Sequence, residues 1–173
     1  VFIHGIGGGV SSAALQIVKL LGGCAFVSSS SDAKLAQAKA MGADYCYNCE
    51  QPDVVREVLR ETEKRGVDVV VDNVGEVTWL QSLQMVRRGG KIVTCGATTG
   101  PNPKTEIRAI FWKQIDILGS TMGNRSEYSE LVQLLGKGHL KPIIDRVFPL
   151  DEGKQAMEYL QCQKQFGKVL LVS

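Results

Sequence analysis

The sequence lacks the features that mark a membrane protein or a nucleic-acid-binding protein. No apolar run approaches the roughly 20 residues that a membrane-spanning helix requires. Twenty lysine and arginine residues stand against eighteen aspartate and glutamate residues, and the net charge of +2 argues against a broad basic surface for nucleic acid or a membrane. The first residues do not combine a basic segment with an apolar one, so we expect no export signal.

The sequence is also poor in metal-binding and disulfide patterns. It holds two histidines, His4 and His139, for which we expect structural or surface roles. Cys46 and Cys49 form a Cys-x-x-Cys pair, but no second pair or nearby histidine completes a zinc site. The five cysteines are an odd number in a chain long enough to fold without disulfides, which favours reduced thiols. We therefore predict no metal site and a cytoplasmic location.

Short apolar runs alternate with segments of helical spacing along most of the chain. The run Val67–Asp72, VDVVVD, is apolar on both faces apart from its aspartates, which is typical of a strand in the middle of a parallel sheet. We expect Asp32 to cap the second helix, Pro52 to lie early in the third, and Gly89-Gly90 to stop the fourth. The expected strands are 1–4, 24–28, 44–47, 67–72, 91–95 and 116–118, and the expected helices 10–21, 32–41, 52–62 and 78–86.

Strands separated by helices of this length form βαβ units with right-handed crossovers. We therefore predict an α/β fold, a doubly wound parallel sheet (Rossmann fold) in three αβα layers.

The last part of the chain departs from this alternation. Ser126–Leu135 is expected as one more helix, and GKGHLKP then breaks the pattern. A short apolar run, an acidic helix and a final apolar strand follow at Val147–Leu150, Asp151–Leu160 and Gly167–Val172. No helix returns that last strand to the main sheet. We predict a Rossmann domain at 1–142 and a strand-helix-strand tail at 143–173 that belongs to a second structural unit.

A glycine-rich stretch follows the first predicted strand and leads into the first predicted helix. A dinucleotide loop there needs a tight turn, a close backbone approach to the pyrophosphate and close packing of helix on strand, and glycine suits all three because it lacks Cβ. Gly7, Gly8 and Gly9 can supply the turn and the approach. Ser11 falls at the packing position, where it is small and its hydroxyl can cap amides. The alternative is a glycine-rich turn that binds nothing, but the βαβ context favours a cofactor.

The end of the second predicted strand indicates which dinucleotide binds. An acidic residue about 20 residues past the loop holds the ribose diol of NAD. Here Ser28–Ser31 provide no acid before Asp32, while serine hydroxyls and Lys34 suit the 2′-phosphate of NADP. In the alternative interpretation, the serines form a polar loop and Lys34 is a solvated surface residue. We predict NADP, with NAD left open.

Several strings along nearly the whole chain resemble the medium-chain dehydrogenase/reductase family, the zinc-type alcohol dehydrogenase and quinone oxidoreductase group. They include HGIGGGVSSAALQIVKLLG, GVDVVVDNVG, GGKIVTCGATTGPNP and LKPIIDRVFPLDEGKQAMEYLQCQKQFGKVLLVS, in family order. The resemblance implies a tyrosine that helps to hold NADP after the third strand, where this chain has Cys49. It also implies four groups of cofactor-binding residues. These are Gly7, Gly8, Gly9 and Val10 under the pyrophosphate, Ser29, Ser30 and Lys34 near the adenosine ribose, Asn73, Val74 and Gly75 beside the cofactor, and Cys95, Gly96, Ala97 and Thr98 at the nicotinamide half.

The resemblance also accounts for the tail, which in the family returns to an N-terminal, chaperonin-10-like catalytic domain. That domain carries the catalytic zinc ligands of zinc-type members and much of the substrate pocket. The implied protein is therefore the cofactor-binding part of a longer oxidoreductase, inactive by itself. In the family the sixth strand often pairs with its counterpart in a second subunit, so we expect a homodimer.

The expected function is to position nicotinamide for hydride transfer with an alcohol or carbonyl, a quinone or an activated alkene. The first alternative is a module that senses a dinucleotide or serves a structural role without catalysis. A preceding catalytic domain in the native gene product would separate the two. A second alternative, a methyltransferase-like sheet, is disfavoured because GGKIVTCGATTG and the tail follow the dehydrogenase order.

Overall fold

The computed structural model describes residues 1–51 and 53–173, so Pro52, expected early in the third helix, lies outside the described residues. Six strands form one parallel sheet in the order β3-β2-β1-β4-β5-β6. Strand order runs outward from β1 in both directions, which confirms the doubly wound arrangement. The strands are β1 (Phe2–Ile3), β2 (Phe26–Ser29), β3 (Tyr45–Asn48), β4 (Val67–Asp72), β5 (Val86–Thr94) and β6 (Asp116–Gly119).

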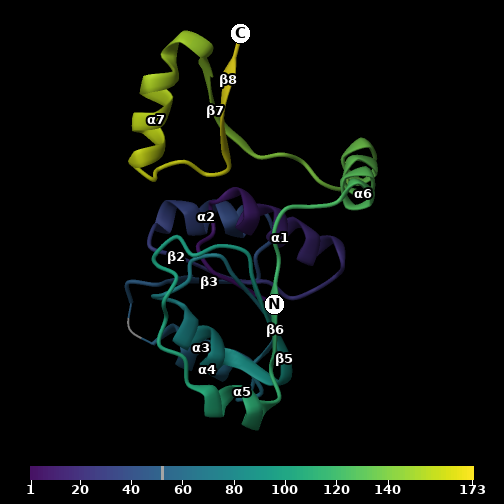
Figure 1. The fold of residues 1–173 in the computed structure, drawn as a ribbon, viewed down its shortest axis with the longest axis vertical. Coiled ribbons are helices and arrows are strands. Elements are labelled where there is room, and N and C mark those ends of the chain that lie inside the picture. The colour runs from purple at the N-terminus through teal and green to yellow at the C-terminus, as the bar shows by residue number, and fades with distance from the viewer. Residues whose placement is uncertain (52) are drawn as a thin grey trace.

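Helices cover both faces of the sheet. One face carries α1 (Gly9–Leu20) and α2 (Asp32–Ala40), and the other carries α3 (Val54–Glu61), α4 (Trp79–Met85) and α5 (Ile107–Lys113) (Figure 1). Successive side chains of a strand point to opposite faces, so Phe2 enters the core under α3 and α4 while Ile3 enters the core under α1 and α2. The three-layer αβα prediction is confirmed. Within the described residues, no helix is long and apolar enough to cross a membrane.

The N-cap of α2 is Ser31, so the expectation that Asp32 caps this helix is wrong. Ser31 has an extended backbone, and its hydroxyl oxygen accepts a hydrogen bond from the amide of Lys34 at 3.4 Å. Asp32 is the first helical residue, where the helix dipole favours its carboxylate. That carboxylate also accepts a hydrogen bond from Asn48 Nδ2 at 2.8 Å.

β5 begins at Val86, directly after α4, rather than at Lys91. Its register with β4 shifts between these two residues, because β5 carries extra residues that bulge out of the ladder. Gly89 lies in this segment with a φ of +64°, a conformation that glycine adopts without strain. Gly89-Gly90 therefore lies within a strand, and the expectation that it stops a helix is wrong.

α5 was not expected from the sequence. Its sequence IRAIFWK leaves Phe111 57% exposed and Trp112 70% exposed, and none of its residues is buried. Helices are predicted from apolar residues that repeat on one buried face, but here Ile110 packs partly buried against the core while Ile107, Phe111 and Trp112 are exposed. Its last residue, Lys113, instead donates hydrogen bonds to three carbonyl oxygens at the end of α4, at 2.8 to 3.0 Å.

The tail forms a small unit above α1 and α2 (Figure 1). β7 (Ile144–Pro149) and β8 (Lys168–Val172) pair in parallel as a separate two-stranded sheet, with η1 (Leu150–Glu152) and α7 (Gly153–Gln161) between them. α6 (Arg125–Gly136) precedes this unit and stands apart from the main sheet. The strand-helix-strand tail is confirmed, and the boundary between residues 142 and 143 stays a prediction.

Phe166 joins the tail to the main sheet. Its ring is 3% exposed and belongs to the core cluster of Ile3, Leu15 and Val27. The amide of the next residue, Gly167, donates a hydrogen bond to the carbonyl oxygen of Gly7 at 2.8 Å. The tail therefore rests directly on the glycine-rich loop.

Replacing Phe166 tests this placement. We expect Phe166→Ala to lower the free energy of unfolding by about 3–5 kcal/mol, because it leaves a cavity in the core. Urea denaturation followed by circular dichroism measures the loss. Phe111→Ala is the matched control, because that ring is mostly exposed and its loss should cost less than about 1 kcal/mol. Equal losses in the two variants would contradict the docked tail.

Candidate functional site

The loop between β1 and α1 has the tight turn expected of a phosphate loop. Gly5 and Gly7 have φ values of +63° and +114°, in the region that favours glycine. Ser11 is buried under the loop, where its Oγ accepts a hydrogen bond from the amide of Gly8 at 3.1 Å. The same hydroxyl donates to the carbonyl oxygen of Gly5 at 2.9 Å. Ser11 therefore fills the packing position and caps an amide, as expected from the sequence.

Two lysine side chains lie against the glycines of this loop. A Cβ atom on Gly7 would come within 2.8 Å of Lys34 Cδ, and one on Gly9 within 2.6 Å of Lys168 Nζ. The ammonium of Lys168 thus lies beside the N-terminus of α1, where the helix dipole is also positive. Two like charges repel unless an anion lies near both, so this arrangement fits a bound phosphate group.

Lys168 was not among the residues expected at this loop from the sequence. The residue lies at the other end of the chain from the loop, and its segment reads as an apolar strand. The available signal was the single charged residue at the start of KVLLV, directly after Gly167. Only the packing of the tail on the loop shows what that charge faces.

The structure gathers Ser29, Ser30 and Lys34 where β2 ends and α2 begins, but their polar groups differ in availability. Ser29 is buried, and its Oγ accepts a hydrogen bond from the amide of Ser31 at 3.2 Å. Ser30 is exposed. Lys34 Nζ donates to the carbonyl oxygen of Gln163, between α7 and β8, at 2.6 Å, and partial burial lowers its pKa. Ser30 and Lys34 are thus the groups that could face a ligand at this end.

Asn73, Val74 and Gly75 form a tight turn at the end of β4. Gly75 has a φ of +93°, and a Cβ atom there would lie 2.8 Å from the carbonyl oxygen of Gly100. A Cβ atom on Gly5 would lie 3.0 Å from Val74 Cγ2. The turn therefore contacts the glycine-rich loop on one side and the loop after β5 on the other.

The loop after β5 is exposed from Cys95 to Thr98. Thr98 Oγ1 donates a hydrogen bond to the backbone carbonyl oxygen of Asn73 at 2.9 Å. Asn73 Oδ1 is buried and has no hydrogen-bond partner among the described residues. A buried acceptor without a donor costs free energy, so this atom is a point where a ligand's donor group would be stabilising.

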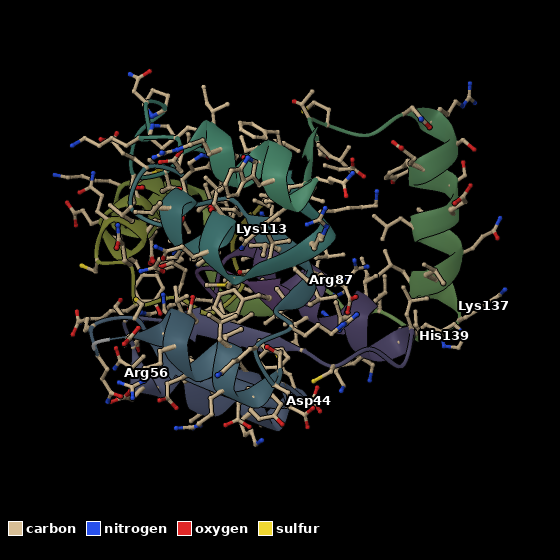
Figure 2. The ribbon with its side chains drawn as sticks, turned by 90° about the horizontal axis from the view of Figure 1, so that it is seen from below. Asp44, Arg56, Arg87, Lys113, Lys137 and His139 are labelled. Carbon is tan, nitrogen blue, oxygen red and sulfur yellow. The ribbon has the colours of Figure 1, made fainter. Side chains whose placement is uncertain are left out.

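His4 is buried at the end of β1, with 1% of its surface exposed. Its Nε2 lies 3.0 Å from Ser82 Oγ and its Nδ1 3.4 Å from Ser28 Oγ. Burial lowers the pKa of His4 to about 4, against the opposing effect of Asp72, so the ring is neutral at neutral pH. His139 lies in the exposed segment after α6 (Figure 2).

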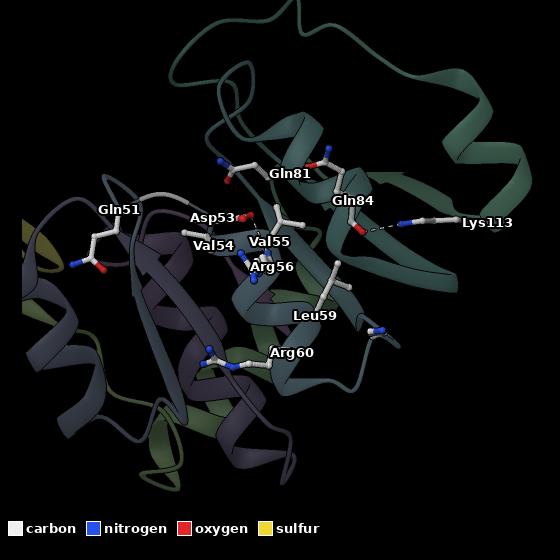
Figure 3. A pocket seen from close by; sticks show the side chains of 11 residues that line it. Gln51, Asp53, Val54, Val55, Arg56, Leu59, Arg60, Gln81, Gln84 and Lys113 are labelled. Carbon is white, nitrogen blue, oxygen red and sulfur yellow. Dashed lines mark hydrogen bonds between the residues drawn. The ribbon is translucent and has the colours of Figure 1, made fainter.

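Other hollows lie outside the predicted site. A groove of about 1130 Å³ is lined by Val55 and Leu59 of α3 and by Gln81 and Gln84 of α4 (Figure 3). None of the predicted cofactor-binding residues lines it. An apolar cleft of about 280 Å³ between α1 and α6 does include residues of the loop region, Gly9 and Lys168.

Possible metal ligands are dispersed in the structure. Across residues 1–51 and 53–173, no group of three or more histidine, cysteine, aspartate or glutamate side chains is arranged to hold a metal ion. All five cysteines are unpaired, including Cys46 and Cys49.

Comparison with known proteins shows which family the chain resembles in sequence and fold. The model of the zinc-binding dehydrogenase family matches residues 9–137. The zinc-type alcohol dehydrogenase-like protein YogA of Leptosphaeria maculans is 32% identical over 99% of this chain and 50% of its own. A crystal structure of NAD-dependent alcohol dehydrogenase has a TM-score of 0.92 at 36% identity, over 99% of this chain and 50% of its own. The 2-octenoyl-CoA carboxylase reductase CinF, in complex with NADP and 2-octenoyl-CoA, has a TM-score of 0.87 at 31% identity, over 98% and 42%. The chain spans about half the length of the relatives it matches.

The pKa of His4 predicts how stability depends on pH. Because the unfolded chain takes up a proton near pH 6.5 and the folded ring only near pH 4, stability is fully present above pH 6.5 and is lost as the pH falls toward 4. We expect the free energy of unfolding to fall by up to about 3 kcal/mol more in the wild type than in His4→Gln over this range. Urea denaturation at several pH values measures it. His139→Gln should keep the wild-type dependence, and the same dependence in His4→Gln would contradict the buried neutral ring.

Proposed function

Because the chain belongs to the zinc-binding dehydrogenase family, we propose that it binds NAD(P)(H) and positions the nicotinamide for hydride transfer. The partner in that transfer is an alcohol or carbonyl, a quinone or an activated alkene. The observation that carries this proposal is the glycine-rich loop at the N-terminus of α1 with the ammonium of Lys168 beside it. The cofactor supplies the hydride chemistry, and the protein supplies binding, orientation and electrostatics.

The described residues fit a dinucleotide along the carboxyl ends of the strands. Gly7, Gly9 and Val10 would hold the pyrophosphate with backbone amides, because the first amides of a helix have no partner within it. Gly8, whose amide donates to Ser11 Oγ, would contribute the close backbone approach instead. Lys168 would add a charge-assisted hydrogen bond to the same phosphates.

The other two parts of a dinucleotide fit neighbouring groups. Ser30 and Lys34 would face the adenosine ribose. The Asn73–Gly75 turn, with its unpartnered Asn73 Oδ1, and the Cys95–Thr98 loop would face the nicotinamide half.

We propose NADP as the preferred dinucleotide, with NAD as the alternative. Ser30 is exposed and no acidic side chain precedes Asp32 after β2, which supports a phosphate rather than a free ribose diol. Lys34 supplies the positive charge, although its ammonium is bonded to the carbonyl oxygen of Gln163. A 2′-phosphate would therefore compete with that oxygen for the lysine. The solved relatives include one described as NAD-dependent and one with NADP bound.

Catalysis needs groups beyond this site. The proposed site consists of glycines, hydroxyl side chains, lysines, one amide, the thiol of Cys95 and small apolar residues, and we assign no catalytic acid or base among them. We propose that the catalytic groups, and any zinc, belong to a separate domain of a longer oxidoreductase, so that this chain alone does not turn over substrate. The chain's span of half its relatives' length supports this, and its five unpaired cysteines fit a cytoplasmic enzyme.

We also propose that two copies associate through β6. This strand is the edge of the main sheet, and all four of its residues are exposed, including Ile117 and Leu118. An apolar edge strand needs a cover, and a second copy of the same strand would provide one.

Removing the charge of Lys168 tests the phosphate site. We expect Lys168→Met to weaken binding of both NADPH and NADH about tenfold, because a charge-assisted hydrogen bond to phosphate is lost. Isothermal titration calorimetry measures both affinities. Lys154→Met is the matched control, because the side chain of Lys154 is 90% exposed on α7. Wild-type protein that binds neither dinucleotide would refute the proposed function.

Removing the charge of Lys34 tests the preference for NADP. We expect the wild type to bind NADPH more tightly than NADH, and Lys34→Ala to weaken NADPH about tenfold with little change for NADH. Lys39→Ala, a lysine later in the same helix, should leave the ratio unchanged. Equal affinities in the wild type, or tighter binding of NADH, would exclude the role assigned to Lys34.

A further inference from the structure

A row of buried polar side chains lies next to the candidate site, where β1, β2 and β4 end. Ser28, His4, Ser82 and Asp72 come from four different elements, and each is at most 3% exposed. Ser28 Oγ lies 3.4 Å from His4 Nδ1, His4 Nε2 lies 3.0 Å from Ser82 Oγ, and Ser82 Oγ lies 2.7 Å from Asp72 Oδ2. We call these four residues the buried polar row. Buried polar groups are costly unless all are bonded, so its members depend on one another.

The hydrogen bonds of the row have a defined direction. Ser82 has one hydroxyl proton, and its shortest acceptor is Asp72 Oδ2, at 2.7 Å against 3.2 Å for the carbonyl oxygen of Thr78. With that proton given to Asp72, the hydrogen bond to His4 requires Nε2 of the ring to be the donor. His4 Nδ1 then accepts from Ser28. The neutral ring of His4, protonated on Nε2, meets both requirements.

The second oxygen of Asp72 holds the turn that follows β4. Asp72 Oδ1 accepts hydrogen bonds from the amides of Val74 at 3.1 Å and Gly75 at 3.0 Å, and from Thr78 Oγ1 at 2.9 Å. All the described partners of Asp72 are uncharged donors. An aspartate that bonds amides two and three residues ahead fixes the turn between them, so this carboxylate sets the course of the Asn73–Gly75 turn.

The Asn73–Gly75 turn also holds the loop after β5. Thr98 Oγ1 donates to the carbonyl oxygen of Asn73 at 2.9 Å. The amide and the hydroxyl of Thr99 both donate to the carbonyl oxygen of Val74, at 2.9 and 2.8 Å. The exposed loop therefore takes its position from the turn, and the turn takes its position from Asp72.

We propose that Asp72, held in place by Ser82 and His4, is a positioning residue for the nicotinamide half of the bound cofactor. It acts through the Asn73–Gly75 turn and the Cys95–Thr98 loop. The adenosine and pyrophosphate half is held by other elements, namely the glycine-rich loop, α2 and the tail. The inference rests on the proposed function, because it needs a dinucleotide in the site.

Paired ligands test this division. NADPH is compared with 2′-phospho-ADP-ribose, and NADH with ADP-ribose, because each pair differs only by the nicotinamide. In Ser82→Ala, we expect the dissociation constant of the dinucleotide to rise about tenfold and that of its ADP-ribose partner to change less than about twofold. Calorimetry measures all four affinities in the wild type and the variant. A role in overall stability alone would change both members of a pair together.

Two further variants separate the hydrogen bond from the bulk of the side chain. His4→Leu removes the donor to Ser82 and should reproduce the selective loss, whereas His4→Gln keeps an N–H donor and should restore most of the affinity. The double variant Ser82→Ala/His4→Leu should be no worse than the more impaired single variant, because both act through Asp72. Thr62→Ala removes a hydroxyl that bonds Val58 and Gly66, away from the site, and is the matched control.

The outcomes are distinct. A selective loss in Ser82→Ala and His4→Leu with rescue by His4→Gln supports the inference. Equal losses for both members of a pair, or no loss in either, overturn it while leaving the proposed function intact. Wild-type protein that binds each ADP-ribose as tightly as its dinucleotide also overturns it. Failure of the wild type to bind all four ligands removes the proposed function, and this inference with it.

Discussion

The whole sheet depends on the burial of two side chains in β1. Phe2 and Ile3 are fully buried, pair with β2 on one side and β4 on the other, and place one side chain in each of the two cores. Strand order reverses at β1, so the crevice at its carboxyl end is where an open α/β sheet offers space to a ligand. The glycine-rich loop lies at this end of the sheet because it directly follows the short strand β1. The place of the site is thus a consequence of core packing.

On the proposed function, the candidate site has an adenosine end and a nicotinamide end, and different interactions hold the two. At the adenosine end, the tail meets the loop through the ring of Phe166, the amide of Gly167 and the ammonium of Lys168. At the nicotinamide end, the hydrogen bonds of Asp72 fix the backbone. The packing of the tail on the loop can loosen gradually, whereas breaking the hydrogen bonds of the buried Asp72 carboxylate costs much free energy. We therefore expect the adenosine end to be the more mobile of the two.

The fold could be predicted from the sequence where residues bury one face at a regular period. Leu15 and Leu35 lie on the buried faces of helices that the spacing predicted, and Val70 lies in a strand predicted by its β-branched neighbours. α5 could not be predicted, because its largest apolar residues, Phe111 and Trp112, are exposed and its end is held by Lys113. The prediction that Gly89 stops a helix was wrong because glycine is common both at the ends of helices and at bends in strands. Only the register of β5 shows which of the two applies here.

The same limit applies to the site. The glycines of the loop are adjacent in sequence, so a shared role for them could be proposed from spacing alone. Ser29 was expected after the second strand but is the last residue of β2, and the amide of Ser31 occupies its hydroxyl, which no pattern reveals. Lys168 reaches the loop only because the tail folds back. Contacts between distant segments depend on the assembled structure, and the buried polar row of four elements is the clearest case.

The hydrogen bond from Lys34 to Gln163 has a consequence for how nucleotide preference can change. The acceptor is a backbone oxygen, so substitution of the Gln163 side chain does not remove it. On the proposed function, the free energy gained from a 2′-phosphate is reduced by the free energy of this internal bond. The segment between α7 and β8 thereby affects the choice between NADP and NAD, although it is not among the residues proposed to contact the nucleotide. Lengthening or shortening it would alter the choice between the two dinucleotides while every residue that faces them stays the same.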